Sequence, residues 1–135
     1  MRKLYVFLAL VFIGTGITAQ DFKFEKDVIN YGQVEQNSNG ERTFVFTNVG
    51  KAPLIIKNVQ STCGCTVPKK PEKPIMPGEK GEIKVSYDTK RLGGFSKSII
   101  IYSNALAGRK VIKIRGSVMK PEAVKLEKKK SLLHN

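Results

Sequence analysis

The amino-acid sequence predicts an all-β fold, an immunoglobulin-like seven-stranded antiparallel β-sandwich. Two observations lead to this prediction. Apolar and polar residues alternate in several short segments, as they do in strands that bury one face and expose the other to water. Turn-forming residues separate these segments at regular intervals, and no long segment shows the 3.6-residue repeat of an amphipathic helix. The 135-residue chain has the length of one such domain.

The strands are expected in the segments where this alternation is found. One or two edge strands are predicted in residues 22–34, followed by strands within residues 41–50, 52–60, 81–89, 95–104 and 109–118. Short turns rich in Asn, Gly and Pro divide them, at residues 37–40, 48–53, 76–81, 91–94 and 103–108. The apolar positions of three strands should form one core shared by both sheets, and they are Phe44, Phe46, Ile83, Val85, Ile112 and Ile114.

The turn at residues 48–53 has a specific structural interpretation. Asn48 can bond to backbone groups within the turn, and Gly50 tolerates a positive φ. We therefore expect this pair to shape the chain rather than to bind a ligand.

The two ends of the chain differ from the strand region. Residues 1–19 have the pattern of a signal peptide: two basic residues, an unbroken apolar run over residues 4–13, and small residues up to Ala19. That run is ten residues long, against the roughly 20 that span a bilayer as a helix. We expect residues 20–119 to form the exported domain, periplasmic or extracellular, which is not an integral membrane protein once the signal is removed. Residues 120–135 are expected to be a basic, flexible tail with room for a short helix from Glu122 onward.

The net charge of +13 is large and raises the question of an anionic partner. A basic surface attracts lipid head groups, polyanionic envelope glycans or nucleic acid. The basic residues are scattered between acidic ones, so an ordinary basic surface is the preferred interpretation. A nucleic-acid partner is not expected, because no aromatic residues are interleaved with the positive charges.

Four stretches together resemble a known family. They are FVFTNVGKAPLIIKNVQSTCGCTVP, PIMPGEKGEIKVSYDT, GGFSKSIIIYSNA and IRGSV, in this order. They resemble the bacterial exported family named domain of unknown function 1573, which is similar to the hydin-like and major-sperm-protein-like immunoglobulin folds. The resemblance covers residues 22–118, and its most specific parts are Asn48-x-Gly50, Cys63-Gly64-Cys65 and Pro77-Gly78. It implies a seven-stranded sandwich in the cell envelope and no activity.

The side chains available for catalysis are few. The single histidine, His134, is next to last in the predicted tail, where the fold cannot hold it as a base. A histidine-based catalytic zinc site is missing for the same reason. No glycine-rich phosphate loop is present. We therefore expect no enzyme activity, no catalytic residues and no cofactor.

Cys63 and Cys65 are the only cysteines, and the sequence leaves four interpretations open for them. They could form a strained local disulfide with redox activity, bind a soft metal such as Cu(I), link two chains, or serve as a structural element at a strand end. One pair supplies only two metal ligands, so both are weak metal candidates. The structural interpretation is preferred, with the pair as a possible disulfide or redox pair.

The leading hypothesis is a non-enzymatic, exported immunoglobulin-like module that binds a protein or another envelope component. Its basis is a complete sandwich pattern without a catalytic constellation. The alternative is a thiol-based accessory protein, either a redox carrier or a copper-handling protein, that uses Cys63 and Cys65.

Overall fold

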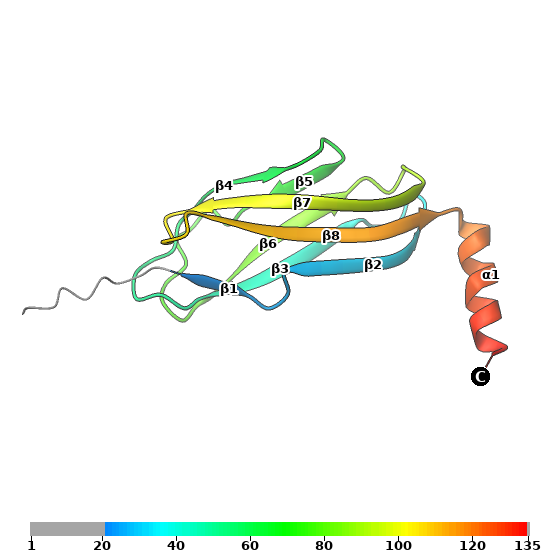
Figure 1. The fold of residues 1–135 in the computed structure, drawn as a ribbon, viewed down its shortest axis with the longest axis horizontal. Coiled ribbons are helices and arrows are strands. Elements are labelled where there is room, and N and C mark those ends of the chain that lie inside the picture. Colours follow the sequence, from blue (N-terminus) through cyan, green and yellow to red (C-terminus); the bar gives the residue numbers. More distant parts are fainter. Residues whose placement is uncertain (1–20, 135) are drawn as a thin grey trace, which may run out of the picture.

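The computed structural model describes residues 21–134 and shows two four-stranded sheets packed face to face (Figure 1). The strands of sheet A, in spatial order, are β1 (Phe22–Phe24), β3 (Glu41–Asn48), β6 (Lys80–Tyr87) and β5 (Thr66–Lys69). Those of sheet B are β2 (Val28–Glu35), β8 (Arg109–Met119), β7 (Gly93–Ser103) and β4 (Ile56–Ser61). A helix, α1 (Pro121–Leu132), follows the last strand.

The strand count corrects the prediction of seven antiparallel strands, because the described residues form eight. The eighth strand is β5 (Thr66–Lys69), a segment in which no strand was predicted. Residues 22–34 supply two strands, as the prediction allowed, one in each sheet, since the chain crosses from sheet A to sheet B over the exposed residues 25–27. The crossing also changes the pairing. β1 runs antiparallel to β3, whereas β2 runs parallel to β8, so the sandwich is not wholly antiparallel.

The core lies between the sheets and is built from alternate residues of each strand. The six residues predicted to share it are all at most 1% exposed, which confirms the assignment of their strand faces. β6 alternates strictly between exposed and buried residues, and one of its inward positions is Gly81. A Cβ on this glycine would lie 2.4 Å from the ring of Phe46. The Phe46 ring therefore fills the space that a larger residue on β6 would need.

Four phenylalanines from β1 and β3 strengthen one side of this core. Phe22 and Phe46 meet edge to face with ring centroids 5.4 Å apart, and Phe24 contacts Phe46 at the same centroid distance. Phe24 also packs perpendicular to Phe44. Such aromatic pairs stabilise a fold by about 0.5–1.5 kcal/mol beyond the area they bury. The short strand β1 is thus held by its two rings as well as by its backbone pairing.

Asn48 organises the opposite end of the sandwich from α1, as the sequence predicted for this turn. Its side chain is fully buried, and its Nδ2 donates to the carbonyls of Ala52 (2.9 Å) and Ile75 (2.8 Å). Its Oδ1 accepts from the N–H of Gly50 at 2.9 Å. A buried amide with all three bonds made avoids the penalty of an unpaired polar group. It joins the β3–β4 turn to the segment that precedes β6.

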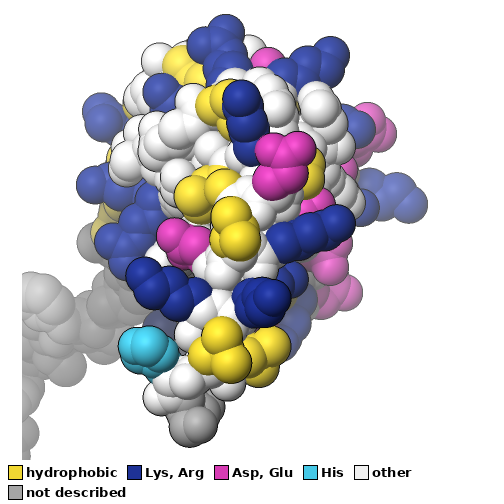
Figure 2. All heavy atoms as spheres, turned by 90° about the vertical axis from the view of Figure 1, so that its right-hand side faces the viewer, with side chains coloured by type: hydrophobic (Ala, Val, Ile, Leu, Met, Phe, Trp, Pro, Cys, Tyr) yellow, Lys and Arg dark blue, Asp and Glu magenta, His cyan; other side chains and the backbone are white. Residues whose placement is uncertain are grey.

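Residues 121–132 of the expected tail form α1, which the sequence allowed from Glu122. Pro121 suits the first turn of a helix, where its missing N–H has no partner to lose. Glu122 in the first turn and Lys129 and Lys130 in the last turn complement the helix dipole. Val124 is buried, whereas the leucines of the helix are exposed among basic side chains (Figure 2).

The predicted signal peptide, residues 1–19, lies outside the described residues. Within residues 21–134, no helix is long and apolar enough to cross a membrane.

Replacing Phe46 with Ala should lower the free energy of unfolding by ~3–5 kcal/mol, because the cavity lies at the centre of the shared core. Urea or thermal unfolding would measure the loss. Lys84→Ala, on the exposed face of the neighbouring strand, is the control and should change stability by less than about 0.5 kcal/mol. An unchanged melting temperature for the Phe46 variant would show that the ring does not contribute to this core.

Candidate functional site

The two cysteines lie in the turn that carries the chain from β4 in sheet B to β5 in sheet A. In the structure they form a disulfide across Gly64, with their Cα atoms 5.4 Å apart. The Cys65 side chain is 7% exposed and belongs to the core, while Cys63 is half-buried beside it. The bridge therefore closes one end of the sandwich rather than projecting into solvent.

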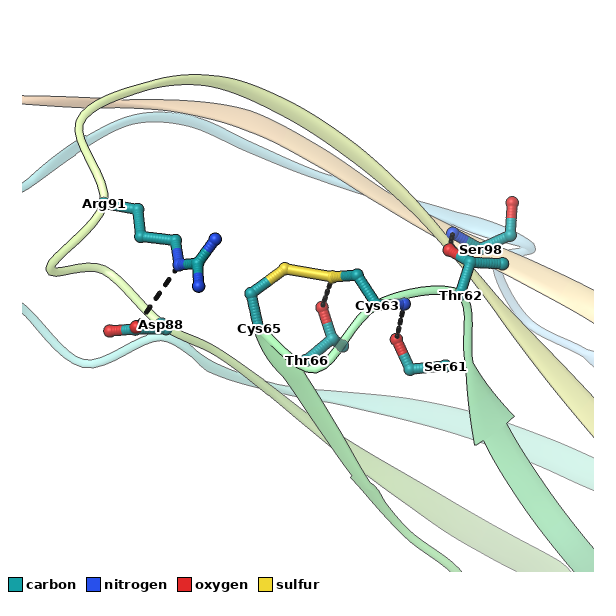
Figure 3. Close-up of a disulfide and its surroundings, with 8 residues drawn as sticks. All are labelled: Ser61, Thr62, Cys63, Cys65, Thr66, Asp88, Arg91 and Ser98. Carbon is teal, nitrogen blue, oxygen red and sulfur yellow. Dashed lines mark hydrogen bonds and ion pairs between the residues drawn. A yellow bond between two sulfur atoms is a disulfide. The ribbon is translucent and has the colours of Figure 1, made fainter.

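Polar contacts hold this turn against the ends of β4 and β5, against β7 and against the loop after β6 (Figure 3). The N–H of Cys63 donates to Ser61 Oγ at 3.3 Å, and the Cys63 Sγ lies 3.8 Å from Thr66 Oγ1. The carbonyl of Cys65 accepts from the N–H of Asp88 at 2.9 Å, in the loop after β6. The N–H of Thr62 donates to the carbonyl of Ser98 on β7 at 3.1 Å. The local backbone is thus held by bonds that do not depend on the bridge.

This arrangement gives the thiol-based alternative no support. Each sulfur is bonded to the other, so neither is a thiolate that could bind copper or attack a disulfide. Among residues 21–134, no group of three or more His, Cys, Asp or Glu side chains is placed to hold a metal ion. His134 follows α1 and shares a shallow surface depression with Glu127, Lys130 and Ser131. All three of these neighbours belong to the helix, so the structure does not bring the histidine to the cysteines.

A second candidate site, which sequence reasoning missed, is the partly uncovered edge of β3. β1 pairs only with Phe46–Asn48 of that strand. The chain then leaves sheet A after one more bond, from the N–H of Glu25 to the carbonyl of Val45 at 3.0 Å. Because backbone groups two residues apart point the same way along a strand, those of Thr43 face the same open side. The sequence does contain one indication that β1 ends here, because the charged run Glu25-Lys26-Asp27 interrupts its alternation.

A groove lies along this edge, between β3 of sheet A and β2 of sheet B. Its volume is about 460 Å³. Polar and apolar residues line it in similar numbers: Glu25, Lys26, Val28, Ile29, Asn30, Thr43, Phe44 and Val45. Ile29 packs against the core and Phe44 is part of it, so the groove reaches the interior of the sandwich. In this structure it offers a strand edge next to an apolar floor, and we refer to it as the edge groove.

Arg42 and Tyr31, the chain neighbours of the groove residues Thr43 and Asn30, contact each other. The guanidinium carbon of Arg42 lies 4.3 Å from the centre of the Tyr31 ring, and Nη1 donates to the carbonyls of Asn39 (3.1 Å) and Glu41 (2.8 Å). The Tyr31 hydroxyl donates to the carbonyl of Gly40 at 2.7 Å. Burial raises the pKa of Tyr31 to about 12, even though the Arg42 charge opposes this shift. The phenol therefore stays neutral near pH 7 and keeps this donor.

Replacing both Cys63 and Cys65 with Ser should cost less than about 2 kcal/mol, because a three-residue loop removes little entropy from the unfolded chain. Urea unfolding of the double variant, compared with chemically reduced wild type, would separate the loss of the bridge from the change of residues. Loss of the folded state in both samples would show that the bridge holds the turn by more than loop closure.

Comparisons with known proteins agree with this fold. A protein of unknown function from Porphyromonas gingivalis W83 matches at 17% identity with a TM-score of 0.66, covering 79% of this chain and 51% of that one. This chain thus spans about half the length of that relative. The PapD-like domain 7 of human CEP192 matches at 10% identity with a TM-score of 0.63, covering 88% and 99% of the two chains. No curated protein matches this sequence.

Other matches include chains with known roles. The chaperone–tip adhesion subunit complex CsuC–CsuE of Acinetobacter baumannii matches at 15% identity with a TM-score of 0.55, covering 81% of this chain and 66% of that one. The VesB protease of Vibrio cholerae contains a similar domain, and the match covers 31% of that chain. At such identities these likenesses show the fold alone. The family match is more specific, since it spans residues 22–118, and the chain belongs to the family described as Protein of unknown function (DUF1573).

Proposed function

We propose that this chain is a non-enzymatic binding module that is exported to the cell envelope and takes a protein partner there. The family match and the immunoglobulin-like fold support a binding or structural module. The pilus chaperone complex among the matches supports a protein as the partner class. The leader pattern of residues 1–19 supports export.

The edge groove is the observation that carries this proposal. An extended segment of a partner can add to a sheet whose edge is open, because its backbone continues the ladder while alternate side chains enter a pocket beside it. At β3 the added strand would pair beyond the end of β1, next to Thr43. Its inward side chains would contact Ile29, which is partly buried and packs against the core at the base of the groove.

The edge strands on the other side of the sandwich have features that discourage the addition of a partner strand. β5, the opposite edge of sheet A, has four residues and contains Pro68, which has no N–H to donate. β4, the opposite edge of sheet B, is irregular between Ile56 and Asn58. Short strands, prolines and bulges all discourage strand addition at an edge. The edge groove is therefore the more accessible site for an added strand.

Export predicts a shortened chain outside the cytoplasm. The mature protein should begin at or near Gln20, because the small residues before it suit a signal-peptidase cut. Intact-mass measurement of the protein in the periplasmic or extracellular fraction would test this. A form that retains Met1 in that fraction would contradict removal of the signal.

Strand addition predicts that Thr43→Pro weakens partner binding without unfolding the domain. Proline removes the N–H of residue 43, which faces the open edge and is not needed by β6. Capture from cells with tagged wild type should return a partner. The variant should recover at least about tenfold less of it, which corresponds to a loss of roughly 1.4 kcal/mol of binding free energy.

Ser86→Ala, on the outer face of β6, is the matched control and should recover the partner as wild type does. Thermal unfolding would confirm that both variants are folded. Equal recovery by the proline variant would exclude the edge groove as the binding site. No partner above background in repeated captures with wild type would contradict the proposed function itself.

A further inference from the structure

The outer faces of the two sheets carry different charge. On sheet A, basic and acidic side chains are mixed: Lys23, Lys69, Lys80 and Lys84 against Glu41 and Glu82. On sheet B the exposed charged residues of β4, β7 and β8 are all basic, namely Lys57, Arg109, Lys113 and Arg115. We call these four residues and the strands that carry them the basic face. The acids beside it, Asp27 and Glu35, lie at the two ends of β2.

The cations of the basic face form no ion pair within the described chain. The ion pairs among residues 21–134 join Lys80 to Glu25, Arg91 to Asp88 and Lys110 to Asp21. None of them involves a residue of the basic face. Figure 1 looks onto this face, with β7, β8 and β2 in front of sheet A and α1 displaced to one end. The four side chains are therefore open to a ligand.

Three of the cations lie in a line along β8. Arg109, Lys113 and Arg115 are separated by even numbers of residues, so their side chains project from the same face of the strand. At about 3.4 Å per residue, this line extends for roughly 20 Å from the first to the last. A single phosphate or carboxylate would reach one or two of them, whereas a linear polyanion would contact all three.

The line has apolar neighbours at its middle and polar ones toward Arg115. Val111 lies between Arg109 and Lys113 and pairs with Ile100, and Val28 of β2 pairs with Lys113. Ser98 pairs with Lys113, and Arg115 lies between Ser96 and Asn30. Tyr102 pairs with Arg109 at the other end of the line. The large hydrophobic residues well exposed on these strands are Val28 and Val111, so the face offers little apolar surface to insert into a bilayer. Tyr102 is the aromatic ring beside this line, and one ring is too few to stack successive bases of a nucleic acid.

We propose that the basic face binds an acidic polysaccharide. Arg109, Lys113 and Arg115 would each contact a carboxylate of the same polymer chain, and the arginine guanidinium offers paired N–H donors for this contact. The hydroxyl and amide groups beside them would bond to sugar hydroxyls. Charge complementarity carries this proposal, and none of the four cations of the basic face lines the edge groove.

The test is binding of polygalacturonate, a linear uronate polymer, to the mature chain by isothermal titration calorimetry. The wild-type protein should bind polygalacturonate and show no detectable binding to neutral dextran. Its affinity for polygalacturonate should fall as the salt concentration is raised well above about 0.1 M. The double variant Lys113→Glu, Arg115→Glu should bind at least tenfold more weakly. Lys69→Glu, Lys84→Glu on sheet A makes the same change in net charge and should bind as wild type does.

Several outcomes would overturn the proposal. Equal losses in the two double variants would mean that only the overall charge attracts the polymer. Tighter binding to vesicles of equal parts phosphatidylglycerol and phosphatidylcholine, or to single-stranded DNA, than to polygalacturonate would assign the face to another ligand. Melting temperatures of all variants would confirm that they are folded. Capture of the protein partner should be unaffected by Lys113→Glu, Arg115→Glu, so failure here leaves the proposed function standing.

Discussion

Burial of alternate side chains between the two sheets is the interaction on which the rest of this structure depends. Each large apolar side chain that is fully buried contributes about 1.5–3 kcal/mol, and the core contains residues of this kind from five of the eight strands of the described chain, namely β1, β3, β6, β7 and β8. The fit of Phe46 against Gly81 shows how closely the sheets approach. By contrast, the Cys63–Cys65 bridge closes so small a loop that its entropic contribution is minor. The packed core fixes the turn, and the bridge adds to it.

The strand faces could be predicted from sequence because alternation is a local signal. Phe44 and Phe46 point inward for the same reason that Thr43 and Val45 point outward, and neighbouring residues contain that information. The pairing of strands could not be predicted in this way, because it depends on residues far apart in the chain. The charged run after β1 indicates that the strand ends, but it does not indicate that this end lies opposite Phe46, or that the next strand joins the other sheet beside β8. The edge groove follows from that ending and was therefore missed.

The cysteines illustrate a second limit of sequence. A Cys-Gly-Cys segment is compatible with a bridge, a metal ligand pair or an intermolecular link, and only the surrounding fold distinguishes them. Here the carbonyl of Cys65 is bonded to Asp88 and its side chain is in the core, which favours a structural element. The basic residues show the same limit. Their scatter along the chain favoured an ordinary basic surface, and only the register of the strands shows that β8 carries three of them on one face.

The parallel pairing of β2 with β8 has a consequence for how the molecule is assembled. β2 belongs to the first third of the chain, but its only partner in sheet B is the last strand before α1. During synthesis β2 stays unpaired until β8 has left the ribosome, which happens only when nearly the whole domain has been made. The loop that its pairing closes is long, and such non-local contacts slow folding. Sheet B therefore cannot be completed in a partly synthesised chain, because an early fragment that contains β2 lacks the strand with which it pairs.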